Sequence, residues 1–194
     1  MKRILLIVLA AGLILSLSAA LVFAQRQDST EMTLGRDIAV EIVEGNKEYP
    51  VELSEKQWRS RLSEFEYHIL REDGTERAYT GELYDTKEKG IYYSRATGQP
   101  LFSSEHKYES GTGWPSFWRP IEFDRVDYYV DRKLWMERIE VTDSSSGSHL
   151  GHVFEDGPEP TGLRYCLNSA ALIFVPEGEE PPEIVREYLA THGE

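Results

Sequence analysis

The sequence of 194 residues contains a single cysteine, Cys166. One thiol excludes an intramolecular disulfide, and the lack of any Cys-x-x-Cys pair excludes the four-thiolate zinc sites that such pairs form. The chain is long enough to bury a hydrophobic core without cross-links. Any thiol chemistry of this protein must therefore run through Cys166.

Positive charge is also scarce. The chain has 21 Lys and Arg against 34 Asp and Glu, a formal net charge of −13 at pH 7. Binding to the phosphates of nucleic acid requires a basic face, and the sequence has no basic cluster to form one. We expect no nucleic-acid partner. No feature of the sequence requires an oligomer, so we expect a monomer.

The N-terminus combines two basic residues with an apolar run that ends in small residues, "MKRILLIVLAAGLILSLSAALVFA". This order is typical of a secretory signal peptide with cleavage after Ala24. The apolar run of about 20 residues is also long enough to span a bilayer, so an uncleaved membrane anchor is the alternative. Residues 1–24 therefore predict an exported protein, periplasmic or extracellular, with or without a membrane anchor.

Residues 25–53 mix charged and apolar positions, and we interpret them as a tether that adds at most an edge strand. The next segment contains Ser54 with Gln57 and Ser63 with Glu66, two matches to the capping-box spacing at a helix start. They predict short helices over 54–61 and 64–71. The apolar residues expected to face the core are Leu62, Phe65, Ile69 and Leu70.

Short runs rich in Tyr, Phe, Val and Ile fill the region 81–175, separated by Gly, Pro, Asp and Ser. This pattern predicts a compact antiparallel β fold. The predicted strands are "GIYYS", "PLFSS", "VDYYV", "RIEVT", "HLGHVF" and "AALIFV". Residues 176–194 begin with a solvated linker, "PEGEEPPE", and end with a short predicted helix, "EIVREYLATHG".

Cys166 lies in "RYCLNSAAL", directly after the turn-rich segment "GPEPTGLRY". An isolated cysteine usually packs as a small hydrophobic residue. Arg164, if its side chain points inward, favours the reactive thiolate at Cys166, and Asn168 offers a hydrogen-bond donor for a developing oxyanion. Two histidines, His149 and His152, occur in the preceding strand. Their offset of three residues points them to opposite strand faces, which argues against a shared metal site.

Trp114 is surrounded by Gly111, Gly113 and Pro115 in "SGTGWPSFW". Packing in the core is the usual role of a tryptophan. On a glycine-rich loop, however, the indole is displayed where no regular element requires it. Such an aromatic wall suits a site that holds a methyl or thioether group.

Together these motifs resemble the methionine-R-sulfoxide reductase family of the B type. The resemblance rests on "LREDGTERAYTGELYDTKEKGIYY", "GTGWPSFWRPI" and "HLGHVFEDGPEPTGLRYCLNSAAL", and it covers about Ser54 to Val175. It implies that 54–175 form the catalytic domain. The implied fold class is mainly β, with two antiparallel sheets and short peripheral helices, as in methionine sulfoxide reductase B.

The resemblance also implies residue roles. Cys166 matches the catalytic cysteine, which attacks the sulfoxide sulfur and becomes a sulfenic acid. His152 and Asn168 match catalytic polar residues that position the sulfoxide and support proton delivery to its oxygen. Trp114 matches the substrate-binding tryptophan that packs against the methyl group, and His149, which matches the first histidine of the same motif, is also expected to bind the substrate. The implied substrate is methionine sulfoxide in oxidised proteins or peptides.

Two departures from the family pattern stand out. Many members hold a structural zinc on four cysteines, and the corresponding residues here are Ser94, Thr97, Asp143 and Ser146. Three hydroxyls and a carboxylate do not replace four thiolates, so we expect no metal and no other cofactor. The position of the usual resolving cysteine is Thr112, which leaves recycling to an external thiol, either a thioredoxin-like protein or a small molecule.

These losses leave one alternative open, a non-catalytic module of the same fold that binds a peptide or small ligand beside Trp114. Retention of Cys166, His152 and Asn168 favours the enzyme, because binding alone needs no nucleophile.

Overall fold

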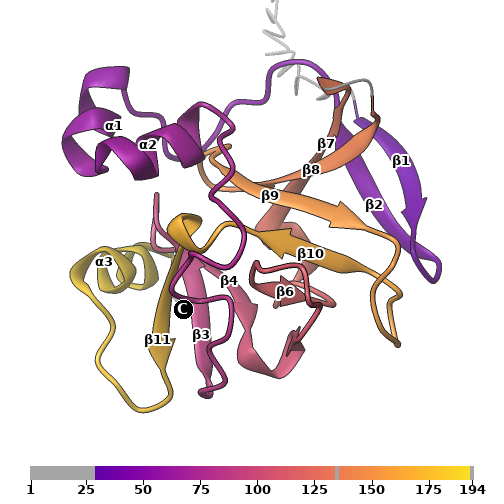
Figure 1. Cartoon of the computed structure of the whole chain (residues 1–194). Helices are drawn as coiled ribbons and strands as arrows, with labels where there is room; N and C mark the ends of the chain where they lie inside the picture. Colours follow the sequence, from indigo (N-terminus) through magenta and orange to yellow (C-terminus); the bar gives the residue numbers. More distant parts are fainter. Residues whose placement is uncertain (1–28, 134–135, 193–194) are drawn as a thin grey trace, which may run out of the picture.

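The computed structural model describes residues 29–133 and 136–192 and shows a mainly β fold with two sheets and short helices (Figure 1). This confirms the predicted fold class. The predicted signal peptide or anchor, 1–24, lies outside the described residues. Across the described part of the chain, no helix is both long and apolar enough to cross a membrane.

The larger sheet has eight strands in the order β1-β2-β7-β8-β9-β10-β6-β5. Their bounds are β1 Ser29–Leu34, β2 Ile38–Val43, β5 Lys107–Tyr108, β6 Ser116–Phe117, β7 Val126–Asp131, β8 Arg138–Asp143, β9 His149–Phe154 and β10 Arg164–Leu167. The smaller sheet has the order β11-β3-β4, with β3 Gly90–Ser94, β4 Pro100–Ser103 and β11 Leu172–Pro176. Neighbouring strands pair antiparallel, except β2 and β7, which meet in parallel at Ile42 and Tyr128.

Each predicted strand is present. The run "AALIFV" begins its strand only at Leu172, because Ser169–Ala171 form a 3-10 helix first. That turn redirects the chain from β10 in the larger sheet to β11 in the smaller sheet (Figure 1). The residues after Cys166 therefore lie where the two sheets meet.

Four fully buried aromatic rings join the sheets. Tyr92 and Phe102 come from the smaller sheet, and Phe117 and Tyr165 come from the larger one. The ring centroid of Phe117 lies 4.9 Å from that of Tyr92 and 4.7 Å from that of Phe102, at angles typical of favourable aromatic pairs. Phe117 and Tyr165 flank Ser116 and Cys166 in sequence, so the core fixes the strands that carry the thiol.

The two predicted helices form as α1, Glu55–Arg61, and α2, Glu64–Arg71. At the start of α2 the Ser63 hydroxyl accepts from the Glu66 amide, and the Glu66 carboxylate accepts from the Ser63 amide. At α1 the Gln57 side chain accepts from the Ser54 amide. The capping spacing therefore predicted both starts correctly.

The core face of these helices was predicted correctly at three of four positions. Leu62, Ile69 and Leu70 are buried, but Phe65 is 54% exposed. The prediction for Phe65 is wrong because the first turn of α2 extends past the core. Phe65 lies on an open surface groove that is also lined by Leu172 and Phe174.

The segment interpreted as a tether is more ordered than expected. Its β1 and β2 form an antiparallel hairpin, and β1 is one of the two edge strands of the larger sheet. Apolar side chains that alternate along the hairpin, including Val40 and Ile42, are buried in the core. The Arg36 amide donates to the Thr161 carbonyl at 2.7 Å, which attaches the hairpin turn to the loop between β9 and β10.

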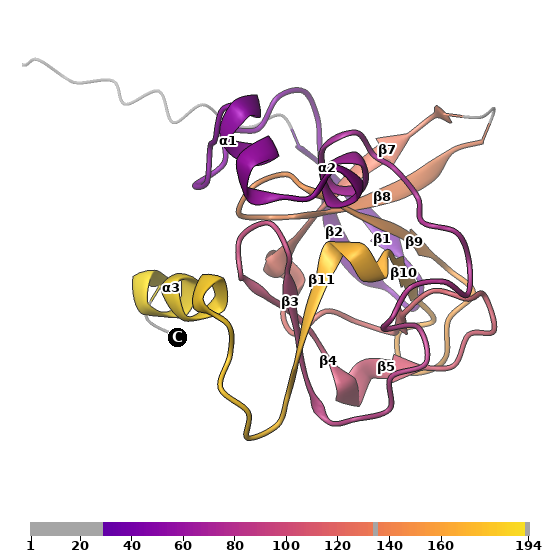
Figure 2. The same cartoon turned by 60° about the vertical axis from the view of Figure 1, so that its left-hand side comes forward.

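The C-terminal helix α3, Glu183–His192, packs against the outer face of the smaller sheet (Figure 2). Its fully buried Val185 contacts Ile173 and Val175 of β11. This forms a second small core on the side of β11 that faces away from the aromatic cluster.

Candidate functional site

Strand register brings the predicted site residues together. Cys166 on β10 lies directly opposite His152 on β9 and opposite Ser116 on β6. His152 is in turn opposite Glu140 on β8. Residues directly opposite in antiparallel strands point to the same face, so these four side chains form one row across the larger sheet.

A β-bulge places the second histidine beside the first. The pairing of β8 with β9 passes from Val141–Gly151 to Thr142–His149 and leaves Leu150 as an extra residue. The predicted placement of His149 and His152 on opposite faces is therefore wrong, because the bulge shifts the alternation by one. Their ring centroids lie 5.4 Å apart. His149 is only 2% exposed, and its Nδ1 lies 2.6 Å from Glu140 Oε1.

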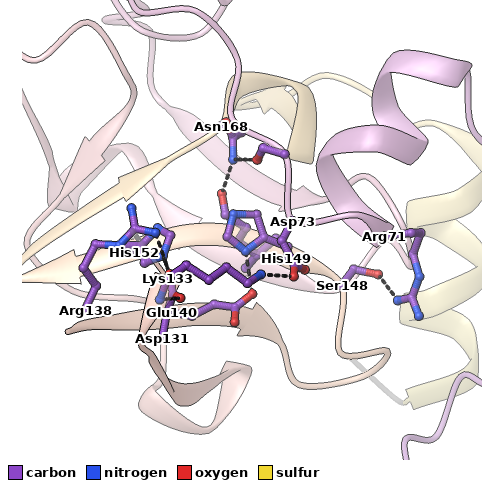
Figure 3. Close-up of polar contacts among 12 residues, drawn as sticks. Arg71, Asp73, Asp131, Lys133, Arg138, Glu140, Ser148, His149, His152 and Asn168 are labelled. Atoms are coloured by element: carbon purple, nitrogen blue, oxygen red, sulfur yellow. Dashed lines mark hydrogen bonds and ion pairs between the residues drawn. The ribbon is translucent and has the colours of Figure 1, made fainter. Parts of the chain in front are cut away.

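His152 is held by an acid that the sequence analysis did not single out. Its Nε2 lies 2.8 Å from Asp131 Oδ2, and Arg138 also donates to that oxygen, at 2.5 Å (Figure 3). Burial opposes ionisation of Asp131, but hydrogen bonds from the Lys133 amide, His152 and Arg138 lower its pKa to about 2. The carboxylate thus accepts from Nε2–H and leaves Nδ1 as the proton acceptor of the ring.

The pKa of His152 is lowered. Burial is the largest cause, the hydrogen bond to Asp131 opposes it, and the nearby positive charge of Arg138 adds to it. The imidazole is therefore mainly neutral at pH 7.

Asn168 does not present free donors to the site. Its Nδ2 donates to the Leu150 carbonyl at 3.1 Å and to the Gly74 carbonyl at 3.4 Å, and its Oδ1 accepts from the Glu76 amide at 3.0 Å. The side chain is 3% exposed. It ties the loop after α2 to the bulge in β9, so its amide supports the wall of the site through internal bonds (Figure 3).

The same loop holds Trp114. The indole Nε1 donates to the Glu76 carbonyl at 3.1 Å, and the Glu76 carboxylate accepts from the backbone amides of Ser169 and Ala170. Gly113 before the indole has φ of 89°, a conformation that favours glycine. The ring is thus held by its Nε1 hydrogen bond, on the loop that precedes β6.

Cys166 and Trp114 line one small cavity of about 120 Å³. Its other lining residues are Thr75, Arg138, Gly151, His152, Phe154, Leu167 and Asn168. His149 is absent from this lining, and its buried ring lies beside that of His152. The structure therefore brings Cys166, His152, Asn168 and Trp114 to one cavity and places His149 in a supporting layer.

The thiol is half-buried, and burial raises its pKa. A hydrogen bond with Thr112 and the charge of Arg164 oppose that shift without reversing it. Arg164 acts on the thiol through its charge and a hydrogen bond, although its Nε and Nη2 also bind both oxygens of Asp156, at 2.8 and 2.9 Å. The sequence-based idea that Arg164 favours the thiolate thus holds in direction, but burial is the stronger effect.

The backbones of β9 and β10 approach each other closely beside the thiol, and this approach requires glycine at position 151. A Cβ added at Gly151 would lie 2.1 Å from the Cys166 carbonyl oxygen, far inside van der Waals contact. Glycine at this position therefore permits β9 and β10 to pair closely at the row that contains His152 and Cys166.

The four residues at the family's zinc positions do come together, but around a carboxylate. The hydroxyls of Ser94, Thr97 and Ser146 donate to Asp143 Oδ2 at 2.6, 2.8 and 3.2 Å, and the Ser145 amide donates to Oδ1 at 2.8 Å. Asp143 is fully buried, and burial raises its pKa while these donors oppose the shift. Hydroxyls are poor zinc ligands, so this donor set does not fit the metal.

Another group with metal-binding atom types is Asp73, Glu140 and His149, whose candidate ligand atoms lie within 4.8 Å of one another. Lys133 Nζ lies 2.6 Å from Asp73 Oδ2 and supplies the positive charge there (Figure 3). We interpret the group as an ion-pair network beside His152.

Sequence reasoning missed Asp131, Arg138 and Glu140. A signal was present, because Arg138 and Glu140 lie inside one predicted strand and Asp131 directly follows another, and charged residues are depleted in strands. Without the register of β7 and β8 against β9, nothing connected them to His152.

Comparison with known proteins adds independent information. Residues 62–176 match the SelR domain family. A peptide methionine sulfoxide reductase MsrB of Methanosarcina mazei is 57% identical over 133 residues, which cover 69% of this chain and 95% of the relative. The MsrB of Leptospira interrogans is 53% identical over 129 residues, which cover 66% of this chain and 98% of that relative. The MsrB of Hahella chejuensis is 51% identical over 124 residues, which cover 64% of this chain and 89% of that relative.

Proposed function

The chain belongs to the SelR domain family and is a peptide-methionine (R)-S-oxide reductase like its MsrB relatives, and from that premise we propose how its residues act. It reduces methionine-R-sulfoxide in proteins or peptides to methionine through a cysteine sulfenic acid. The observation that carries the residue assignment is the pairing of Cys166 with His152 on adjacent strands, with Trp114 on the same cavity.

In the proposed reduction step, Cys166 Sγ attacks the sulfoxide sulfur. Thiol and imidazole are both neutral beforehand, given the raised pKa of Cys166 and the lowered pKa of His152. The thiol proton passes through His152 to the sulfoxide oxygen, which leaves only when protonated. The transient bond between the two sulfurs then breaks as the oxygen moves to Cys166, so the S–O bond of the sulfoxide is lost, an S–OH bond forms on Cys166 and methionine leaves as a thioether. The methionine sulfur is thereby reduced by two electrons, and the cysteine sulfur is oxidised by two.

The neighbouring residues position these groups. Asp131 fixes the His152 tautomer, and Asn168 holds the cavity wall through the bonds described above. For His149 we replace direct substrate contact with support of the His152 ring, because His149 is buried beside it. Trp114 forms the wall for the sulfoxide methyl group.

A non-catalytic binding module is not favoured, because the chain shares more than half of its aligned residues with curated reductases. The decisive experiment is reduction of a methionine-R-sulfoxide peptide with dithiothreitol as reductant. Conversion to methionine with repeated turnover is expected. Binding without conversion would favour the module.

Truncation of the aromatic wall tests the placement of the substrate. Trp114→Ala should raise KM for an R-sulfoxide peptide about tenfold, because the methyl group loses its apolar contact surface. Steady-state kinetics with dithiothreitol measure this. Trp114→Phe is the matched control, since it keeps an aromatic face but lacks the N–H that donates to the Glu76 carbonyl. Equal KM values for all three proteins would contradict this placement of Trp114.

Recycling requires an external thiol, since the chain has no second cysteine. A thiolate attacks the sulfenic acid sulfur, forming a mixed disulfide and water, and a second thiol releases Cys166 as the reductant becomes a disulfide. We propose a thioredoxin-like protein or a small thiol in this role. Oxidised proteins and peptides are the proposed substrates.

Restoring a resolving thiol should change the oxidised product. Thr112 Oγ1 lies 3.8 Å from Cys166 Sγ, so the two side chains face each other, and a disulfide between the two positions requires a Cβ separation of roughly 3.5–4.5 Å. Thr112→Cys should therefore lose two hydrogens per turnover, whereas the wild type gains one oxygen. Mass spectrometry after a single turnover without reductant distinguishes them. An added oxygen with no internal disulfide in the variant would show that position 112 cannot reach the thiol.

We further propose that the protein needs no zinc, because Asp143 and its three hydroxyl donors do not fit the metal. Elemental analysis of purified protein should find no stoichiometric zinc, and EDTA should leave the Tm unchanged. One zinc per chain that survives dialysis would overturn this proposal.

Export to the periplasm or the extracellular space is proposed from residues 1–24, with an uncleaved membrane anchor as the alternative. Cell fractionation with N-terminal sequencing separates the two outcomes. A mature protein that begins at Gln25 supports cleavage, and an intact N-terminus in the membrane fraction supports the anchor. Sedimentation of the same material tests the expected monomer.

A further inference from the structure

Three hydroxyl groups form a row of hydrogen bonds that begins at the Cys166 thiol. Thr112 Oγ1 lies 3.8 Å from Cys166 Sγ and 2.8 Å from Ser110 Oγ. Ser110 Oγ lies 2.7 Å from Ser116 Oγ, which lies 3.1 Å from the Trp114 carbonyl oxygen. Ser116 is fully buried and directly opposite Cys166 in the β6–β10 pair. We call Thr112, Ser110 and Ser116 the hydroxyl chain.

Each hydroxyl carries one hydrogen, so the hydroxyl chain has a direction. The Trp114 carbonyl only accepts. If Ser116 donates to it, Ser110 must donate to Ser116 and Thr112 to Ser110, which leaves Thr112 to accept from the thiol. In the reverse direction Ser116 donates to Ser110, Ser110 to Thr112, and Thr112 to the sulfur.

The two directions match two charge states of the thiol. When the thiol is neutral, the first direction, in which each group donates toward the Trp114 carbonyl, gives every hydrogen an acceptor. With a thiolate, the reverse direction places a donor on the negative sulfur. The Thr112 amide donates to Ser110 Oγ at 3.3 Å, and Ser110 has a lone pair for it in either direction.

We propose that the hydroxyl chain is a reversible hydrogen-bond relay that accepts from the Cys166 thiol and donates to its thiolate. Thr112 and Ser110 are then positioning residues for the reaction. The inference rests on the proposed role of Cys166. Reversal requires only rotation about three C–O bonds and moves no heavy atom, so it adds little reorganisation to the attack on the sulfoxide.

Other groups also act on this thiol, and a test must hold them constant. Arg164 shares β10 with Cys166, Asp156 binds Arg164, and Tyr108 comes from β5. His152 and Arg138 line the cavity on the opposite side. Substitutions at Thr112 and Ser110 change neither the charge nor the identity of these residues, which isolates the effect of the hydroxyl chain.

The first test compares Thr112→Val with Thr112→Ser in the full chain, with iodoacetamide as the probe. Valine keeps the shape of threonine and removes its hydroxyl, whereas serine keeps the hydroxyl. The alkylation rate of Thr112→Val at pH 7 should fall about three- to tenfold, because a donor to the charged sulfur is lost. The alkylation rate on the high-pH plateau should stay unchanged. A slower rate at pH 7 with an unchanged plateau shows that the pKa of the thiol is raised. Thr112→Ser should follow the wild-type pH profile.

The second test is a double-mutant cycle with Ser110→Ala. If Ser110 acts through Thr112, Ser110→Ala should shift the alkylation pH profile in the wild-type background and not in Thr112→Val. A wild-type-like profile for Thr112→Val, no shift from Ser110→Ala, or an equal shift in both backgrounds overturns the relay. Alkylation does not depend on turnover, so wild-type protein that alkylates normally but reduces no sulfoxide would refute the proposed function instead.

Discussion

Cys166→Ser is expected to lower turnover of a methionine-R-sulfoxide peptide by at least about a thousandfold, because a serine hydroxyl is a far weaker nucleophile than a thiol. The substitution changes only one atom, from sulfur to a smaller and more polar oxygen, and keeps the side chain's shape. Its half-buried site on β10 should tolerate it with a stability change within about 1 kcal/mol. Coupled assays with dithiothreitol measure the activity, and thermal unfolding measures the fold.

The control for this variant is substrate binding. Trp114 and His152 are unchanged in Cys166→Ser, so the variant should bind an R-sulfoxide peptide with wild-type affinity, measured by quenching of tryptophan fluorescence. Activity above a few per cent of wild type, in protein free of wild-type contamination, would remove Cys166 from the mechanism.

The second large effect is on stability. Asp143→Ala should lower the free energy of unfolding by about 3–5 kcal/mol, because it leaves three hydroxyls and a backbone amide buried without their acceptor. These donors come from the end of β3 and the turn after it, and from the turn after β8, so Asp143 joins the two segments. Urea unfolding followed by circular dichroism measures the change.

Asp124→Ala is the matched control for Asp143→Ala. Its carboxylate is 87% exposed and lies 3.9 Å from Arg125, so its removal should change stability by no more than about 0.5 kcal/mol. If both variants unfold at the same urea concentration, Asp143 is not the structural link between the two segments. Asp143→Asn should fall between them, since one amide oxygen still accepts.

Much of the architecture was predictable because local signals and tertiary structure agree. Capping residues marked the starts of α1 and α2, and alternating apolar runs bounded by turn residues marked the strands. The exposed Phe65 shows where this fails, because helical spacing identifies a face but not where the core ends. At the N-terminal end the sequence indicated at most an edge strand where the structure has a hairpin, because the two strands carry charges on their exposed face.

For the site, the motifs identified Cys166, His152, Asn168 and Trp114, and all four line one cavity. The detailed roles depended on information that the sequence does not display. One extra residue in β9 moved His149 to the same side as His152. Asp131 reaches His152 only through the register of β7 and β8, a long-range property that residue spacing alone does not specify.

The central claim is that Cys166 receives the sulfoxide oxygen. The most direct test is a single turnover without reductant, using a peptide with methionine-R-sulfoxide and its S epimer in parallel, followed by mass spectrometry of the Cys166 peptide. The account predicts one methionine per enzyme and one added oxygen on Cys166 with the R epimer, and neither with the S epimer. Methionine formation with an unmodified Cys166, or equal reaction with both epimers, would contradict it.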